Sequence, residues 1–226
     1  IFRRLAAAKR SEVFHADWGV QINLSCPNGG LDPNALIEEA VPILDIAERE
    51  LPQSVPAGLK FGPEVHPESM PRVAKHPRLD FICFCNALPF GKQPIWIRKS
   101  QQVDWKALFG TDDPKQSPLA KRFPVPEGKP PFAGGLSGAP LRPFVCEWLE
   151  RVRSLGVHTP IIAGGGLLSA EDAGFAFDAG ADSVSFGSIA ILAPTKTAGA
   201  IKGARWYAKE RSRRPSLDAR ALEYNV

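Results

Sequence analysis

Short apolar runs alternate along the chain with longer segments in which apolar residues recur every three or four positions. The short runs predict β-strands, and the recurring pattern predicts amphipathic α-helices. The expected strands span residues 19–24, 57–61, 81–86, 160–163 and 182–186. Strand and helix alternate through five units with no return to an antiparallel pattern. We therefore expect a parallel α/β fold.

Residues that begin and end helices support these elements. Asp32 and Pro33 suit the N-cap and the first position of a helix in which Pro42 predicts a kink. Ser169 and Asp172 have the spacing of a capping box, and their helix is expected to end near residue 180. The other expected helices cover residues 68–75, a segment striped by Leu141, Val145, Leu149 and Val152, and a last segment through Ile201 and Trp206.

Polar residues and glycines follow the ends of the expected strands. These positions are Asn23, Lys60, Asn86, the glycines 164–166, and the pair 187–188. A (β/α)8 barrel builds its site from the carboxyl ends of several strands, whereas a doubly wound sheet concentrates its glycines after the first strand. The sequence therefore favours a (β/α)8 TIM barrel. We interpret the units as strands four to eight of that barrel, with residues 1–226 forming the C-terminal part of a single domain.

Residues 92–131 interrupt the strand–helix rhythm. The segment is rich in Pro, Lys, Gln and Asp, and it is far longer than an ordinary βα loop. We therefore treat it as an insert loop that serves as a lid or a binding arm, or that is disordered.

The composition narrows the function classes without choosing among enzymes. The net charge of +4 suits a small anionic substrate or a phosphate-bearing cofactor, but no Lys/Arg block points to nucleic acid. We see no signal peptide and no apolar run of transmembrane length, so we expect a cytoplasmic protein without a membrane partner. The four cysteines include no CxxC pair, and we expect neither a disulfide framework nor a metal site.

The loop after the first strand carries the most chemistry. Cys26 stands between Asn23 and Asn28, where a thiolate is able to act as a base and the two amides to bind a planar amide or imide. A buried structural cysteine between two turn-forming asparagines remains the alternative. Cys83 and Cys85 are expected to be core residues, because cysteine is among the most buried residue types.

Two further kinds of position are candidates for ligand binding. Lys60 lies in an otherwise apolar strand, where it either faces a ligand at the barrel mouth or extends to solvent. Asn86 places another amide at the barrel mouth. Three glycine segments allow backbone N–H groups to approach a ligand closely, and they contain Gly134 and Gly135, Gly165 and Gly166, and Gly187 with Ser188.

The Cys26 loop and the glycine segments together resemble the class 1 dihydroorotate dehydrogenases over about residues 19–192. The resemblance implies an FMN-binding barrel in which Cys26 is the catalytic base and Asn23, Asn28 and Asn86 hold the pyrimidine. It further implies that FMN is bound by Lys60, Gly134, Gly135, Gly165, Gly166, Gly187 and Ser188. Ala87 departs from the family, which has Ser or Thr after the asparagine, and it removes one hydroxyl hydrogen bond.

The activity implied by the resemblance is the oxidation of dihydroorotate to orotate in pyrimidine (UMP) synthesis. Cys26 would take a proton from C5 of dihydroorotate while a hydride leaves C6 for FMN. The electron acceptor would be fumarate, or NAD through a partner subunit, and we expect a homodimer. The alternatives are another FMN barrel, of the dihydropyrimidine dehydrogenase or tRNA-dihydrouridine synthase type, and a truncated non-catalytic remnant.

Overall fold

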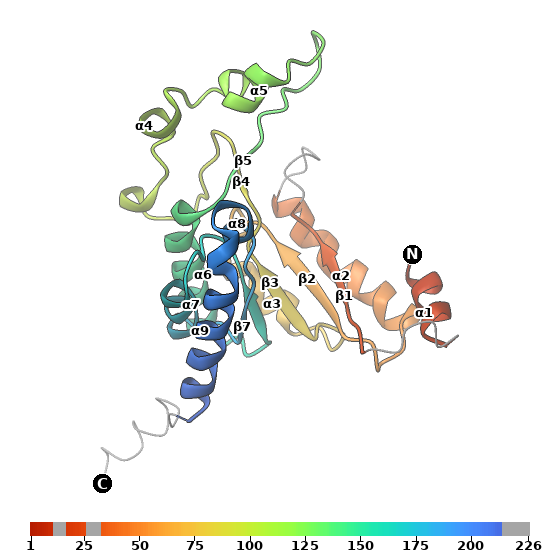
Figure 1. Cartoon of the computed structure of the whole chain (residues 1–226). Helices are drawn as coiled ribbons and strands as arrows, with labels where there is room; N and C mark the ends of the chain where they lie inside the picture. Colours follow the sequence, from red (N-terminus) through yellow and green to blue (C-terminus); the bar gives the residue numbers. More distant parts are fainter. Residues whose placement is uncertain (11–16, 26–32, 214–226) are drawn as a thin grey trace.

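The computed structural model describes residues 1–10, 17–25 and 33–213 of the chain. Its centre is a parallel sheet of five strands in the order β1-β2-β3-β6-β7 (Figure 1). The strands are β1 (Val20–Asn23), β2 (Ala57–Phe61), β3 (Phe81–Phe84), β6 (Ile161–Ala163) and β7 (Ser183–Val184). Each strand lies beside the preceding one, without the reversal that defines a doubly wound sheet. This order confirms the expected partial barrel.

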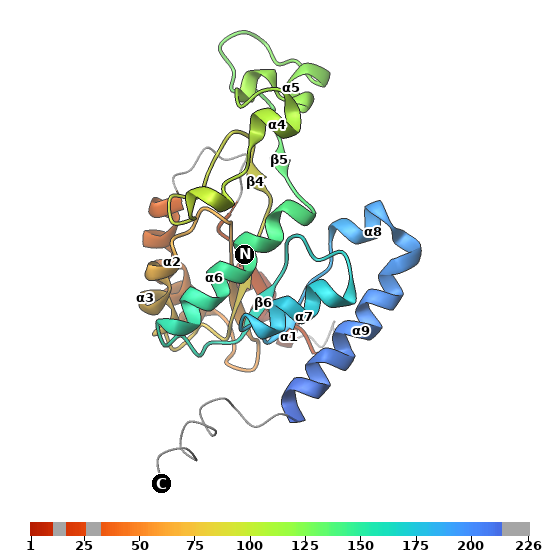
Figure 2. The same ribbon diagram turned by 90° about the vertical axis from the view of Figure 1, so that its left-hand side faces the viewer.

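Helices follow the strands as the sequence predicts. They stand side by side along the body in Figure 2, and the larger ones are α2 (Pro33–Glu50), α6 (Arg142–Ser154), α7 (Ala170–Asp178) and α9 (Pro194–Arg213). The smaller elements are α1 (Phe2–Arg10), α3 (Met70–Ala74), α8 (Ser188–Leu192), η2 (Pro67–Ser69) and η5 (Ala139–Leu141). Helix α2 continues through Pro42, whereas its expected cap, Asp32, lies outside the described residues. The predicted cap of α7 is confirmed, because Ser169 Oγ accepts a hydrogen bond of 3.1 Å from the N–H of Asp172.

The two faces of the sheet differ sharply in burial. Leu59, Ile82 and Ile161 are register partners on the face that packs against the helices, and all three are fully buried. On the same face, the ring of Phe84 stacks on Trp148 of α6 with centroids 4.0 Å apart. The opposite face carries Asn23, Lys60, Cys83, Ile162 and Ser183 as one row of register partners, and all but Cys83 are at least partly exposed. The hydrophobic core therefore lies between the sheet and the helices.

A buried arginine fixes the amino-terminal end of β2 and β3. Arg78 is 1% exposed and donates hydrogen bonds to the carboxylate of Asp80 and to the carbonyls of Pro52 and Val55. Asp80 directly precedes β3, and its Oδ2 also accepts the N–H of Ala57, the first residue of β2, at 2.8 Å. One carboxylate thus joins two neighbouring strands to the loop that enters β2.

The same arrangement recurs two strands further on. Asp182 directly precedes β7, and its Oδ2 accepts the N–H of Ile161, the first residue of β6, at 2.8 Å. Arg153 donates to this carboxylate, as Arg78 does to Asp80. Arg153 also donates to the carbonyls of Val157, Thr159 and Gly180. We call these two groups the arginine clamps.

The insert is more ordered than a loop. It contains η3 (Lys99–Gln101), α4 (Trp105–Phe109), η4 (Pro114–Gln116) and α5 (Pro118–Arg122), and it rises from the ribbon formed by β4 (Leu88–Pro89) and β5 (Gly135–Leu136) (Figure 1). Its base is anchored, because Trp96 is buried and donates from Nε1 to Pro63 O at 3.0 Å. Trp105 of α4 likewise donates from Nε1 to Lys92 O at 3.0 Å. Of the three alternatives for this segment, disorder is therefore not what the structure describes.

We predict that Arg78→Met lowers the free energy of unfolding by about 3 kcal/mol, because Asp80 and two carbonyls lose their donor in a buried site. Urea unfolding measures the change. The matched control is Arg72→Met, which breaks an exposed ion pair with Glu38 and should change stability little. Equal losses in the two variants would contradict the role of the clamp.

Candidate functional site

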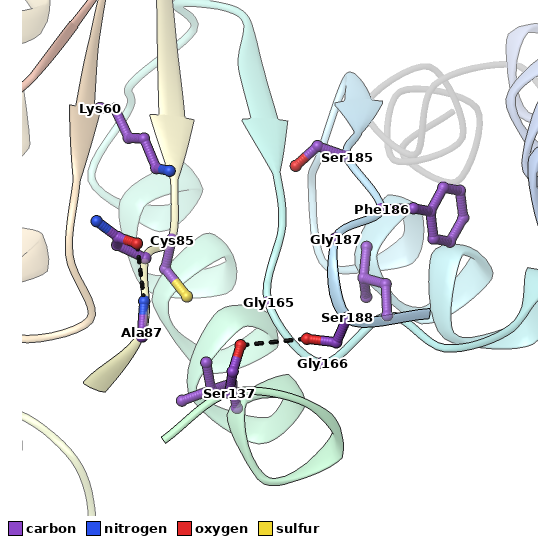
Figure 3. Close-up of a pocket in the computed structure, with 13 residues that line it drawn as sticks. Lys60, Cys85, Ala87, Ser137, Gly165, Gly166, Ser185, Phe186, Gly187 and Ser188 are labelled. Carbon is purple, nitrogen blue, oxygen red and sulfur yellow. Dashed lines mark hydrogen bonds between the residues drawn. The ribbon is translucent and has the colours of Figure 1, made fainter. Parts of the chain in front are cut away.

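A pocket of about 240 Å³ lies beyond the carboxyl ends of β2, β3, β6 and β7 (Figure 3). Six residues predicted for a site line it: Lys60, Asn86, Gly165, Gly166, Gly187 and Ser188. They come from four different βα units, so the pocket exists only because parallel strands present their carboxyl ends at one edge. None of the pocket-lining residues belongs to the insert.

The remaining predicted residues lie elsewhere or outside the described part of the chain. Gly135 begins β5 of the β4–β5 ribbon, Gly134 directly precedes it, and neither lines the pocket; Gly134 O accepts the N–H of Phe90 at 3.1 Å. Asn23 ends β1 as the register partner of Lys60, beside the pocket. Cys26 and Asn28 lie outside the described residues.

Lys60 brings a positive charge to the pocket. Its side chain comes from β2 and extends toward the end of β3 in Figure 3. In the part of the chain that the structure describes, no carboxylate lies within 4.0 Å of its ammonium group to form an ion pair. The ammonium group is therefore able to donate hydrogen bonds to an electron-rich or anionic ligand.

Cys85 lines the pocket, which the sequence did not predict. It is buried, as expected, but it also lines the pocket next to Gly165. Burial raises the pKa of the Cys85 thiol to about 12, and the opposing effect of the Lys60 charge is smaller. Burial likewise raises the pKa of Cys83. Both thiols are therefore protonated near neutral pH, and neither is suited to act as a base there.

The glycines on the other side of the pocket leave room that other residues would fill. Gly165 and Gly166 have φ values of 91° and 77°, in the left-handed region that favours glycine. A Cβ on Gly166 would come within 2.5 Å of Arg142 N, whereas a Cβ on Gly187 would meet no atom within 4 Å. Close backbone approach is therefore possible at this end.

Hydroxyl groups and free N–H groups complete this end of the pocket. Ser137 Oγ and Ser188 Oγ are 3.1 Å apart and share a hydrogen bond, and both line the pocket (Figure 3). Ser188 begins α8, where the first N–H groups of a helix have no intrahelical acceptor. This donor set fits a phosphate group.

Hydrogen bonds connect two of the predicted amides through Ser25. Asn23 Oδ1 accepts from Ser25 N at 3.0 Å and from Ser25 Oγ at 2.7 Å. Asn86 Nδ2 donates to Ser25 O at 3.0 Å and to Ser25 Oγ at 3.1 Å, and Asn86 Oδ1 accepts the N–H of Ala87 at 3.0 Å. Asn23 and Asn86 are thus held by the residue that directly precedes Cys26.

An ion pair supports the helices beneath the glycines. Arg142, at the start of α6, donates to the carboxylate of Asp172 in α7. Burial by itself raises the pKa of Asp172, but hydrogen bonds from Leu168 N–H, Arg142 and Ser169 hold that pKa below its ordinary value. The charged carboxylate thus ties two helices together below the Gly166 turn.

One side-chain cluster within the described ranges has the composition of a metal site. Asp45, Glu48 and His76 bring their ligand atoms within 4.8 Å of one another. His76 Nδ1 accepts the N–H of Arg78 at 3.1 Å, so the proton of the neutral ring is on Nε2, which lies 3.1 Å from Asp45 Oδ1. The nitrogen that faces the carboxylates is therefore a donor, and the cluster is an ordinary hydrogen-bonded group.

Several residues of the pocket were missed from the sequence, namely Cys85, Ser137, Leu141, Leu167, Ser185 and Phe186. Ser137 lies between Gly135 and Gly138 in a predicted glycine segment, and Ser185 and Phe186 directly precede Gly187. The rule that sites gather past strand ends would have included these three. Cys85 gave no such signal. The sequence indicates only that this cysteine is buried, and a buried thiol is still able to line a pocket.

The strand order and the position of the pocket define the class of protein, a partial (β/α)8 barrel with its pocket at the carboxyl ends of the strands. A solved structure with this fold is that of dihydroorotate dehydrogenase from Eimeria tenella, in complex with ferulenol. It superposes with a TM-score of 0.53 over 92% of this chain and 51% of that chain, at 22% identity.

Within that class, the chain is similar to the dihydroorotate dehydrogenases, as its sequence motifs predict. The model of the dihydroorotate dehydrogenase family matches residues 120–203, which include the three glycine segments. Two curated relatives are both called dihydroorotate dehydrogenase B (NAD(+)), catalytic subunit. The one from Thermodesulfovibrio yellowstonii is 26% identical over 83% of this chain and 54% of that protein. The one from Anoxybacillus flavithermus is 29% identical over 77% of this chain and 48% of that protein. The chain thus spans about half the length of these relatives.

None of the helices within the described ranges combines the length and the apolar character that crossing a bilayer requires.

We predict that Gly166→Ala destabilises the fold more than Gly156→Ala does. Both positions have a φ of 77°, which alone costs an L-residue about 1 kcal/mol. A Cβ at Gly156 meets no atom within 4 Å, but at Gly166 it collides with Arg142 N. Urea unfolding of both variants measures the difference, and equal destabilisation would show that the close approach to Arg142 is unimportant.

Asp172 should contribute stability that depends on pH. Because its pKa is lowered in the folded state, the contribution is full above the ordinary Asp pKa of about 3.9 and is lost as the pH falls through the lower, folded value. Asp172→Ala should therefore be less stable than the wild type at neutral pH, and the gap should narrow between about pH 5 and about pH 2. Urea unfolding across this range measures the gap. Glu127→Ala, at an exposed position of the insert, should parallel the wild type.

Proposed function

We propose that this chain forms the FMN-binding and catalytic part of an enzyme that oxidises dihydroorotate to orotate in pyrimidine (UMP) synthesis. One observation carries the proposal: a single pocket combines the Lys60 ammonium and the Asn86 amide with a cradle of glycines and hydroxyls. The Lys60 ammonium and the Asn86 amide suit a polar heterocycle, and the glycines and hydroxyls suit a phosphate. The names of the curated relatives support the same activity.

The residues of this pocket would hold FMN by its two ends. Lys60 would donate to the ring system, and Gly165, Gly166, Gly187 and Ser188 would bind the phosphate. Ser137 joins the phosphate end through its hydrogen bond to Ser188. Gly134 and Gly135 would act through the β4–β5 ribbon, which positions Ser137. When bound, FMN supplies a hydride acceptor for the oxidation.

Cys26 is the base of the proposed reaction, and Asn23, Asn28 and Asn86 bind the substrate. Cys26 directly follows Ser25. Ser25 is fixed beside the pocket by its hydrogen bonds to Asn23 and Asn86. The Cys26 thiolate takes the C5 proton of dihydroorotate, and the C5–H electron pair forms the new ring double bond as hydride leaves C6. Ala87 offers the substrate no hydroxyl, so Asn86 has to bind it with its amide alone.

The proposal extends to the electron acceptor and to partners. Both curated relatives are called catalytic subunits of an NAD-dependent enzyme, which supports NAD as the final acceptor through a partner subunit rather than fumarate. A homodimer in the cytoplasm accords with this enzyme type. The modest net charge of +4 supports a small anionic substrate over tRNA.

The test uses the full product of the gene that carries these 226 residues. We expect the purified protein to be yellow, to release FMN on denaturation, and to be bleached by dihydroorotate without oxygen. Absence of flavin would overturn the cofactor assignment and favour a non-catalytic remnant. Flavin that is reduced by dihydrouracil but not by dihydroorotate would overturn the substrate and favour the dihydropyrimidine dehydrogenase type.

Cys26→Ala should retain FMN but reduce the rate of bleaching by dihydroorotate by about 100-fold or more near neutral pH, because general base catalysis is lost. Stopped-flow absorbance at the flavin band measures the rate. Cys146→Ala is the matched control, since Cys146 does not line the pocket. An unchanged rate in Cys26→Ala would refute its role as the base.

A further inference from the structure

Ser25 is the centre of the hydrogen bonds beside the pocket, between the two asparagines of the proposed substrate site. Its hydroxyl donates to Asn23 Oδ1 at 2.7 Å and accepts from Asn86 Nδ2 at 3.1 Å. The backbone of Ser25 repeats both contacts, through its N–H to Asn23 and its carbonyl to Asn86. Leu24, which precedes it, is buried and donates its N–H to Lys60 O at 2.9 Å. Ser25 is therefore anchored to the sheet through Leu24.

Two backbone N–H groups identify which atom of each amide is the oxygen. The N–H of Ser25 bonds to Asn23, and the N–H of Ala87 bonds to Asn86. A backbone N–H is only a donor, so the amide atom that receives it must be the oxygen in both cases. The usual ambiguity between amide oxygen and nitrogen is thereby removed.

The two amides consequently offer opposite groups to a ligand. Both acceptor sites of Asn23 Oδ1 are used by Ser25, so its free capacity is the Nδ2 donor, to which no acceptor is bonded among the described residues. Asn86 Nδ2 is used by Ser25, and its free capacity is the second lone pair of Oδ1. Asn23 presents a donor and Asn86 presents an acceptor.

We infer that Ser25 is a positioning residue that sets this donor–acceptor polarity, so that the site selects a ring in which a carbonyl and an N–H are both present. The inference rests on the proposed function and deepens it. A cyclic amide or imide such as dihydroorotate satisfies both asparagines at once. A ring that bears only acceptors would leave the second lone pair of Asn86 Oδ1 without a donor in the complex, which weakens binding.

The first test measures orotate binding to the FMN-loaded protein by isothermal titration calorimetry. Ser25→Ala should raise the Kd by about tenfold, because each asparagine side chain loses one of its two hydrogen bonds to Ser25 and is held less firmly in its orientation. Ser25→Thr keeps the hydroxyl and should stay within about threefold of the wild type. FMN content should be equal in all three proteins. In turnover, KM for dihydroorotate should rise in Ser25→Ala with little change in the pH profile, because the base is intact.

A second ligand tests the polarity itself. Methylating a ring nitrogen of orotate removes one N–H, and whichever of the two methyl isomers lacks the N–H facing Asn86 should bind the wild type about tenfold more weakly than orotate. In Ser25→Ala this penalty should shrink, because Asn86 Nδ2 loses its bond to the hydroxyl and the amide turns more readily. An undiminished penalty, or an unchanged Kd for orotate in Ser25→Ala, would overturn the inference.

A third measurement needs no substrate and separates the inference from the proposed function. In ¹⁵N-labelled protein, the side-chain NH₂ protons of Asn86 should exchange with solvent slowly in the wild type and in Ser25→Thr, and faster in Ser25→Ala. If the wild type fails to bind orotate while this pattern holds, the proposed substrate is wrong but Ser25 still orients the amide. If Asn86 exchange is the same in all three proteins, Ser25 does not hold it and the inference fails.

Discussion

The parallel register of the five strands is the constraint on which the rest of the structure depends. It places Asn23, Lys60 and Cys83 side by side in one row, and it brings four strand ends to one edge. At the opposite edge, the two arginine clamps hold neighbouring strands in step, because one carboxylate bonds to the first N–H of the adjacent strand in each. A shift of one residue in the register of a strand would turn its side chains to the other face of the sheet, and its residues would no longer line the pocket.

The same register divides the molecule into a filled and an uncovered side. The face toward the helices buries residues such as Leu59 and Ile82 completely, whereas the opposite face keeps a row that is mostly exposed. In a closed barrel, side chains from further strands fill this interior. The curated relatives are about twice as long as the matched segment, in keeping with a half-barrel whose pocket residues are already assembled.

Chemistry in the pocket follows from how little freedom its polar groups have. Cys85 is kept protonated by burial, Lys60 has no carboxylate partner among the described residues, and Ser25 fixes the amides of Asn23 and Asn86. The Asn23 and Asn86 side chains, which are held in this way, lose little entropy when a ligand binds, which is the basis of preorganised recognition. The flavin and substrate assignments rest on that arrangement together with the similarity to dihydroorotate dehydrogenases.

The sequence by itself determined the elements and the edge at which a site forms. Strands of buried apolar residues, the Ser169 cap and the glycines past strand ends are encoded locally, and they lie where the pattern predicts. Only the tertiary structure decided that Asn86 bonds to Ser25, 61 positions away, that Cys85 lines the pocket, and that Gly135 belongs to a two-stranded ribbon. The helices of the insert were likewise missed, because Trp96 and its neighbours are ordered by packing against the barrel. Local patterns record which residues are buried, whereas partners distant in the sequence are chosen by the fold that brings them together.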